Sequence, residues 1–321
     1  MSSNQEGDNN LRHTSDGGLE IVDLTNSKGH GFKCYTYDGL YLPVLPPPMQ
    51  ERSCTEIMKD IKTIEMTQED ILICAFQKCG THWLWEVLEM VRSGVIQYKQ
   101  EVKETRMIEM IHKEGIEAVP PPRVLNTHLP LRMLPTQIVE KKVKCIQVMR
   151  NPKDVCVSMF NHYRDLVQPL GYEGDFDEFQ DVFLKGHLPL GSYYDYLISW
   201  RKEVSRSPEV PVFYVVYEEM KTDPVKCIKD IARFLDLTVT DQFCKDVADA
   251  CSFKKMKQVD SELKGDMPIK VWKEGSKGTI YRKGEIGDWK NWFTVAESER
   301  FDEIWNEKMK GSGITFTYSP A

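Results

Sequence analysis

Uninterrupted apolar runs alternate with amphipathic helical patterns along most of the chain. The runs at 71–76, 143–149 and 210–218 lack polar alternation, which is typical of strands buried on both faces of a parallel sheet. A shorter run at 123–128 has the same character, and the three longer runs are each followed by a helical pattern. This alternation predicts an α/β fold, a single domain with a central, mainly parallel β-sheet flanked by helices.

The beginning of the chain and two charged stretches lack this pattern. Residues 1–29 are polar and rich in Ser, Asn, Asp and Gly, so we expect a disordered tail ahead of a domain that spans 30–321. The charged stretch 99–117 is expected to be helical, without clear chemistry of its own. From 254 to 287 the pattern breaks down, and we expect a long irregular segment of the kind that forms functional lids or disordered loops.

Composition narrows the class of protein. The 321 residues carry a net charge of −7, whereas nucleic-acid-binding domains are usually basic, so no nucleic-acid partner is expected. The nine cysteines are odd in number and form no Cys-x-x-Cys pair, which favours reduced thiols over disulfides or a zinc site. No apolar run approaches the length of about 18 residues that a membrane-spanning helix needs, so we expect a cytoplasmic protein without a membrane partner.

The junction after the first apolar run has the chemistry of an anion site. Lys78 and Gly80 form a tight turn ahead of a helix that begins near Thr81. Backbone N–H groups and the positive end of the helix dipole meet at such a turn, and Lys78 adds a full charge. The chain contains no Gly-Lys dipeptide, so it lacks the common P-loop pattern. The alternative is a plain strand-to-helix turn with a solvated lysine.

Reactive side chains follow two further strands. His128 and Arg150 stand at strand ends, where ligands gather in open α/β sheets, and Ser158 lies about two helical turns beyond Arg150. Arg150 and the late run Arg282-Lys-Gly284 suit a phosphate group, since they offer cations and an approachable backbone. As alternatives, Arg150 pairs with a carboxylate, and His128 caps its strand by bonding to the backbone.

Five stretches together resemble the cytosolic sulfotransferases, enzymes that move a sulfuryl group from 3′-phosphoadenosine-5′-phosphosulfate (PAPS) to small acceptors. The resemblance extends from about Phe32 to Phe316. The stretches occur in family order: Phe76-Gln-Lys-Cys-Gly-Thr-His-Trp83, Thr127-His-Leu-Pro-Leu-Arg-Met-Leu-Pro135, Arg150-Asn-Pro-Lys-Asp-Val-Cys-Val-Ser158, Tyr217-Glu-Glu-Met-Lys221 and Arg282-Lys-Gly-Glu-Ile-Gly-Asp-Trp-Lys-Asn291.

The resemblance implies a role for each matching residue. The P-loop-like loop that holds the 5′-phosphosulfate corresponds to Lys78, Cys79, Gly80, Thr81, His82 and Trp83, with Trp83 against the adenine. The 3′-phosphate would be held by Arg150, Ser158, Arg282, Lys283 and Gly284. Tyr217, Cys251 and Phe253 match positions around the adenine and its ribose, and His128 matches the catalytic base.

The implied reaction is an in-line displacement without a metal. His128 would accept the proton of the acceptor, Lys78 would stabilise the leaving oxygen, and Ser158 would hold Lys78 away until the acceptor binds. The small acceptor would meet an apolar pocket, with Phe160 and His162 among its walls.

The chain departs from the family pattern at Asn126, at Phe76, Gln77, Cys79 and His82 of the loop, and at Cys251, which replaces a common threonine. Asn126 stands where the family usually carries a lysine, which removes a cation near the transferring group. The alternative function is therefore a PAPS- or PAP-binding protein of the same fold with weak or lost turnover. Cys79 replaces a serine, and a thiol in a cationic, helix-starting loop is predicted to have a depressed pKa unless it is buried and inert.

A short stretch near the C-terminus matches the dimer motif of the family. Lys290 and Glu299 flank Thr294 and Val295, so the resemblance implies a homodimer through these four residues. The run Thr294–Glu297 is also explained as a capping box that opens the last helix.

Overall fold

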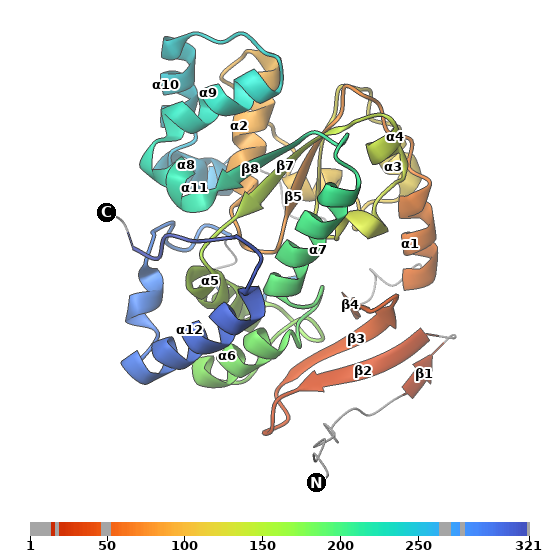
Figure 1. Ribbon diagram of the computed structural model, residues 1–321, viewed down its shortest axis with the longest axis vertical. Helices are drawn as coiled ribbons and strands as arrows, with labels where there is room; N and C mark the ends of the chain where they lie inside the picture. Colours follow the sequence, from red (N-terminus) through yellow and green to blue (C-terminus); the bar gives the residue numbers. More distant parts are fainter. Residues whose placement is uncertain (1–13, 17–18, 46–52, 263–270, 277–279, 320–321) are drawn as a thin grey trace.

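The four apolar runs form one parallel sheet, drawn in Figure 1 from the computed structural model. The structure describes residues 14–16, 19–45, 53–262, 271–276 and 280–319. The sheet has the order β6-β5-β7-β8, and its strands are β5 (Ile71–Ala75), β6 (Val124–Thr127), β7 (Lys144–Met149) and β8 (Val212–Val216). All three pairings are parallel, so the carboxyl ends of the strands share one edge of the sheet. The predicted α/β fold is confirmed.

Helices cover both faces of this sheet, and their starts follow capping signals in the sequence (Figure 1). Asn151 caps a helix that has Pro152 in its first turn, and Thr294 and Glu297 form the expected capping box. The α-helices are α1 (Cys54–Lys62), α2 (Thr81–Ser93), α3 (Lys113–Glu117), α4 (Gln137–Glu140), α5 (Pro152–Asp165), α6 (Phe176–Lys185), α7 (Tyr193–Arg206), α8 (Tyr217–Thr222), α9 (Pro224–Phe234), α10 (Asp241–Ala250), α11 (Phe253–Glu262) and α12 (Val295–Met309). Short 3₁₀ helices are η1 (Lys103–Arg106), η2 (Leu131–Met133) and η3 (Asp288–Asn291).

A second, antiparallel sheet corrects the expected tail. Its order is β1-β2-β3-β4, and its strands are β1 (Thr14–Asp16), β2 (Leu19–Thr25), β3 (Gly31–Tyr37) and β4 (Leu40–Pro43). Val22 and Leu24 are buried while their neighbours are half-buried, so β2 carries a period-two pattern that the polar composition of 1–29 concealed. The boundary at residue 29 is therefore wrong, and residues 1–13 and 17–18 of the expected tail lie outside the described residues.

Two further segment expectations are corrected. The stretch 99–117 is not one helix: it holds only η1 and the short α3, with irregular chain between them. The segment 254–287 begins inside α11, whose Met256 and Val259 are buried, so its first part is a packed helix instead of an irregular loop. Residues 263–270 and 277–279 of that segment lie outside the described residues. Among the described residues, no helix is both long and apolar enough to cross a membrane.

Candidate active site

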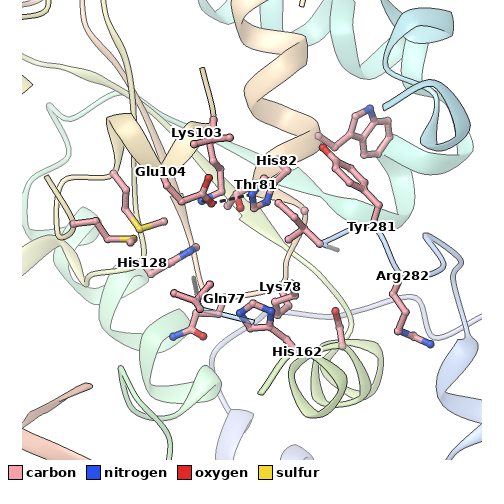
Figure 2. Close-up of a pocket in the computed structure, with 18 of the residues that line it drawn as sticks. Gln77, Lys78, Thr81, His82, Lys103, Glu104, His128, His162, Tyr281 and Arg282 are labelled. Atoms are coloured by element: carbon pink, nitrogen blue, oxygen red, sulfur yellow. Dashed lines mark hydrogen bonds and ion pairs between the residues drawn. The ribbon is translucent and has the colours of Figure 1, made fainter. Parts of the chain in front are cut away.

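A cavity of about 1090 Å³ opens at the carboxyl edge of the parallel sheet. The cavity is lined by His128, which follows β6, and by thirteen other site residues that were predicted from the sequence (Figure 2). The thirteen are Lys78, Gly80, Thr81, His82, Trp83, Arg150, Ser158, Tyr217, Cys251, Phe253, Arg282, Lys283 and Gly284. Cys79 is the exception, since its side chain is fully buried beneath the turn.

The turn between β5 and α2 depends on an unusual backbone. Lys78 has a φ of 64° and Gly80 has a φ of 108°, so two residues of the turn adopt left-handed conformations. A Cβ at position 80 would lie 2.8 Å from Cδ2 of Tyr217, which makes glycine necessary there for space as well as for conformation. Because the turn leads directly into α2, the positive end of that 13-residue helix faces the cavity.

Lys78 is an unusual cation. Burial, followed by the charges of Lys103 and Arg150, lowers the pKa of Lys78 to about 7. A lysine that several cations surround in this way is poised to gain from a bound anion.

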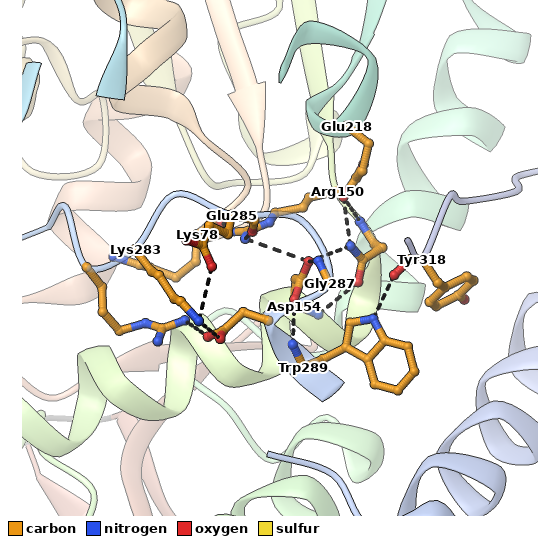
Figure 3. Close-up of polar contacts among 12 residues, drawn as sticks. Lys78, Arg150, Asp154, Glu218, Lys283, Glu285, Gly287, Trp289 and Tyr318 are labelled. Atoms are coloured by element: carbon orange, nitrogen blue, oxygen red, sulfur yellow. Dashed lines mark hydrogen bonds and ion pairs between the residues drawn. The ribbon is translucent and has the colours of Figure 1, made fainter. Parts of the chain in front are cut away.

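Arg150 links the turn to the late segment of the chain. Its side chain is only 8% exposed, and its guanidinium lies 4.4 Å from the ring centre of Tyr217. Nη1 donates to the backbone carbonyl of Lys78 at 3.2 Å, and Nη2 donates to the carbonyl of Glu285 at 3.3 Å (Figure 3). The alternative, an ion pair between Arg150 and a carboxylate, is weak, because Nη2 of Arg150 and Oδ2 of Asp154 are 4.0 Å apart. The guanidinium Nε is buried and has no hydrogen-bond partner among the residues that the structure describes.

Asp154 instead holds the late segment in place. Its two carboxylate oxygens accept the backbone N–H groups of Gly287 at 2.8 Å and Trp289 at 2.9 Å (Figure 3). Arg282 and Lys283, which lie just ahead of these residues, pair with Asp288 at 2.5 and 2.6 Å. Burial alone would raise the pKa of Asp288, but the hydrogen bonds from Lys283, Asn291 and Arg282 hold it well below its usual range.

Gly284 also has a steric reason to be glycine. Its φ is 68°, and a Cβ there would lie 2.1 Å from Cδ2 of Phe253. Phe253 lies edge-on to Tyr281, and Trp83 lies edge-on to Tyr217, so aromatic rings surround one end of the cavity. The indole Nε1 of Trp83 is buried, and no described residue forms a hydrogen bond with it. Flat aromatic surfaces with an unused donor suit a planar, polar ring system.

His128 has one nitrogen committed and one available. Its Nδ1 lies 2.7 Å from the backbone carbonyl of Ala75, which can only accept, so Nδ1 carries the proton and Nε2 carries the lone pair. The backbone N–H of His128 donates to Oε1 of Glu109 at 2.7 Å. Burial, followed by the charge of Lys103, lowers the pKa of His128 to about 3, so the ring is neutral at physiological pH. The backbone bond that was expected as an alternative to chemistry therefore also sets the ring for proton acceptance.

Residues that the sequence analysis missed lie beside the imidazole. Lys103 and Glu104 of η1 line the cavity, although the stretch 99–117 was expected to carry no clear chemistry. Glu104 Oε1 lies 2.9 Å from Nε2 of His82 and 3.1 Å from Nζ of Lys103 (Figure 2). Asn126 exchanges two hydrogen bonds with Lys103. No sequence spacing indicated this cluster, because it depends on the chain returning past β6 at the Met107–Asn126 bridge.

Cys79 differs from its prediction. Burial raises the pKa of the Cys79 thiol to about 12, and its Sγ contacts the backbone carbonyl of Gln77 at 3.8 Å. The predicted depressed pKa is wrong, because the thiol points into the core while the backbone of the turn faces the cavity. Cys251, also expected near the adenine, is 2% exposed and lies 4.0 Å from the sulfur of Met90.

The expected acceptor walls are corrected in part. His162 lines the cavity from α5, as expected. Phe160 does not line it and instead packs with Phe176, Phe179 and Trp292. The apolar lining includes several flexible thioethers, from Met58, Met107, Met110 and Met256. Over the described part of the chain, no group of three or more His, Cys, Asp or Glu side chains could hold a metal ion.

Comparisons with known proteins agree with this geometry. A sulfotransferase domain model matches residues 68–313. Mouse sulfotransferase 1B1 is 35% identical over 268 residues, covering 80% of this chain and 88% of the relative. Human sulfotransferase 1C2 is 32% identical over 303 residues, covering 91% of this chain and 98% of the relative. The crystal structure of mouse sulfotransferase SULT7A1 complexed with PAP superposes with a TM-score of 0.69 at 31% identity, covering 87% of this chain and 95% of that one. The chain therefore belongs to the sulfotransferase family.

Proposed function

We propose that this protein transfers a sulfuryl group from PAPS to the hydroxyl or amine of a small, largely apolar acceptor, with His128 as the general base. The main support for the proposal is that residues from distant parts of the chain line one cavity. Lys78, Arg150 and Arg282 come from three distant parts of the chain and line the same cavity as the His128 ring. The PAP complex of mouse SULT7A1, a relative at 31% identity, supports PAPS as the donor.

The free donors of the cavity fit an adenine nucleotide with two phosphate groups. The Arg150 Nε and the Trp83 Nε1 are buried without partners among the described residues, and buried polar groups of this kind normally have one. Gly80 and Gly284 keep two backbone turns open where a Cβ would clash with Tyr217 or Phe253. Lys78, Arg150, Arg282 and Lys283 supply the positive charge that a polyanion needs.

His128 has the tautomer that a general base requires. Ala75 holds the Nδ1 proton, so Nε2 is the basic atom, and the low pKa of the ring keeps it unprotonated in the free protein. A positioned base of this kind typically contributes about 10²–10⁴-fold to the rate. PAPS supplies the sulfuryl group and a phosphate leaving group. Lys78 is suited to stabilise charge on the leaving oxygen, and Ser158, which lines the same cavity, is suited to restrain Lys78.

The acceptor class follows from the lining. The methionine side chains of positions 58, 107, 110 and 256 are apolar and adaptable, which suits a hydrophobic acceptor of variable shape. Glu109 lines the cavity beside His128, so an acceptor that donates a second hydrogen bond to this carboxyl group is favoured.

Isothermal titration with PAP and a turnover assay on a mixed acceptor panel test the proposal. PAP is expected to bind, and sulfur-labelled PAPS is expected to label at least one hydroxylated or amine acceptor. PAP binding without product on a broad panel would favour the alternative, a nucleotide-binding protein with lost turnover. An absence of PAP binding would contradict the proposal and the alternative together.

We also propose a cytoplasmic homodimer. All nine cysteines are free thiols, which favours a reducing compartment. Val295 is 76% exposed at the start of α12, with the motif residues Lys290 and Thr294 before it in the chain and Glu299 after it. An apolar side chain with this exposure is suited to a small contact with a second copy.

Val295→Glu tests the dimer. The substitution would bury a charge in the contact, so light scattering is expected to report a shift from dimer to monomer with PAP binding retained. The control is Val95→Glu, because Val95 is exposed and does not line the cavity, and this variant is expected to leave the dimer intact. Val271 would be unsuitable as a control because it lines the cavity. An unchanged dimer in Val295→Glu would reject this contact.

A further inference from the structure

Lys103 is a buried cation that the proposed mechanism does not yet use. Its side chain is 1% exposed, although it comes from the short helix η1 and not from a strand end. Removing a lysine from water costs several kcal/mol, so a buried lysine normally has compensating partners. Here the partners are Asn126 Oδ1 at 3.2 Å and Glu104 Oε1 at 3.1 Å.

Lys103 is not the sole partner of Glu104. The same oxygen, Oε1, also lies 2.9 Å from Nε2 of His82. Burial by itself would raise the pKa of Glu104, but Lys103 and His82 hold it well below its usual range. The carboxylate is thus shared between two donors, and its second oxygen is buried without a hydrogen-bond partner in the described part of the chain. Lys103 therefore shares its carboxylate partner with a second donor, and its ammonium group also donates to Asn126.

The positive field of Lys103 reaches the reacting groups. After burial, Lys103 is the largest contributor to the low pKa of both Lys78 and His128. In Figure 2, Lys103, Glu104 and His82 lie together in the upper part of the view, and Lys78 and His128 lie below them. Two lysines that repel each other across a cavity mark the space between them as an anion site.

Asn126 positions the lysine. Its Nδ2 donates to the backbone carbonyl of Lys103 at 2.8 Å, while its Oδ1 accepts from the Lys103 ammonium. One amide side chain on β6 thus fixes both the main chain and the head group of Lys103. The amide is fully buried, so water does not compete for these bonds.

We propose that Lys103 is the second cation of the sulfuryl site, held by Asn126 in place of the lysine that the family usually carries at position 126. This inference rests on the proposed function and adds a catalytic residue to it. The positive charge comes from η1 instead of from β6. The site therefore still has a second cation although position 126 carries an asparagine. Sulfuryl transfer without Lys103 would lack one preorganised donor at the site.

Lys103→Met tests the inference, because methionine keeps much of the length of the side chain without its charge. Removing one preorganised donor at such a site typically lowers kcat by about 10²–10³-fold. PAP has no sulfuryl group, so its dissociation constant is expected to change by no more than about twofold. The matched control is Lys99→Met, whose lysine is half-exposed and pairs with Glu89 away from the cavity, and it is expected to leave both quantities unchanged.

Two further measurements separate a catalytic role from a structural one. Returning a cation from β6 in the double variant Lys103→Met/Asn126→Lys is expected to recover at least about tenfold of the lost kcat, if charge is what Lys103 supplies. The acid limb of the pH profile of kcat/KM is expected to move to higher pH in Lys103→Met, since losing a nearby cation raises the pKa of His128. The charged and titratable groups that face His128 are Lys103, Glu104, Glu109, His82, Lys78 and His162. In Lys103→Met, only Lys103 among these groups is replaced.

The outcomes of this inference and of the proposed function are distinguishable. A wild-type protein that neither binds PAP nor forms product would contradict the proposed function. A wild-type protein that does both, with Lys103→Met retaining kcat and the pH profile, would overturn only the role of Lys103. Loss of PAP binding together with a lower melting temperature in Lys103→Met, without rescue by the double variant, would assign Lys103 to structure and also overturn it.

Discussion

At the scale of single residues, the environment of each side chain decides its chemistry. Lys78 and Cys79 are neighbours in one turn, yet they have opposite surroundings. The Lys78 ammonium lines a cavity with several cations, whereas the Cys79 thiol is buried in the core. The sequence predicted that Lys78 is a cation of the site, because the prediction needed only its charge and its place in a turn between a strand and a helix. It could not predict the burial of Cys79, because the direction of a side chain in a turn depends on φ values such as the 64° of Lys78.

Lys78 supplies a prediction about protons. Because burial and neighbouring cations lower its pKa to about 7 in the free protein, a part of the lysine is neutral near pH 7.5. A bound anion favours the charged form, so its pKa rises and the complex takes up protons. Titrations with PAP in buffers of different ionisation enthalpy should therefore report proton uptake at pH 7.5 that is absent at pH 6, where Lys78 is already charged.

The matched variant for this titration is Lys78→Met. It is expected to bind PAP more weakly, by about tenfold or more, and to lose the proton uptake. Equal uptake in wild type and Lys78→Met would assign the proton to another group and contradict the account of Lys78.

At the scale of elements, strands and their ends were predictable, and segments without periodicity were not. The runs that became β5 to β8 and the capped helices α5 and α12 follow local rules of burial and capping. The η1 segment follows no such rule, because its place beside β6 is set by the bridge between Met107 and Asn126. The helix α11 was missed since only two of its residues are buried, which leaves a weak pattern in a charged stretch.

Two backbone turns depend on glycine, and this dependence can be tested. In Gly284→Ala the new Cβ would lie 2.1 Å from Phe253, so the loop or the ring must move. PAP affinity is expected to fall by at least about tenfold, or about 1.4 kcal/mol, because the Arg282–Lys283 segment shifts with it. The measurement is the PAP dissociation constant by titration calorimetry.

The control for this substitution is Gly94→Ala. Gly94 also has a positive φ, of 69°, but a Cβ there would meet nothing within 4 Å, and it ends α2 away from the cavity. Its cost is limited to backbone strain of about 1–2 kcal/mol of stability. Equal PAP affinity in Gly284→Ala and Gly94→Ala would contradict a packed turn at Gly284.

At the scale of the whole molecule, the site depends on contacts between segments far apart in the chain. Asp154 of α5 binds the backbone at Gly287 and Trp289, and its neighbour Lys153 pairs with Asp302 of α12 at 2.6 Å and lies over Trp289. The segment from Gly287 to α12 is thereby held against α5, the helix that follows Arg150. The sequence indicated which residues belong together through the family resemblance, but not which contacts hold them.

Asp154→Ala tests this long-range connection. Asp154 is not part of the cavity lining, so a purely local account predicts no effect on nucleotide binding. We expect a loss of about 1–3 kcal/mol of stability, since two backbone N–H groups lose a charged acceptor, and a PAP affinity reduced by at least about fivefold. Thermal denaturation and calorimetry measure the two effects. Lower stability with unchanged PAP affinity would contradict a role for Asp154 in positioning the Arg282–Lys283 segment.

The most direct test of the central claim compares sulfuryl transfer and PAP binding in wild type and His128→Ala. With sulfur-labelled PAPS and an acceptor found in the panel, the variant is expected to lose about 10²–10⁴-fold in kcat while its PAP dissociation constant stays within about twofold of wild type. A His128→Ala protein that still transfers the label at the wild-type rate would contradict the assignment of this imidazole as the base beside the nucleotide.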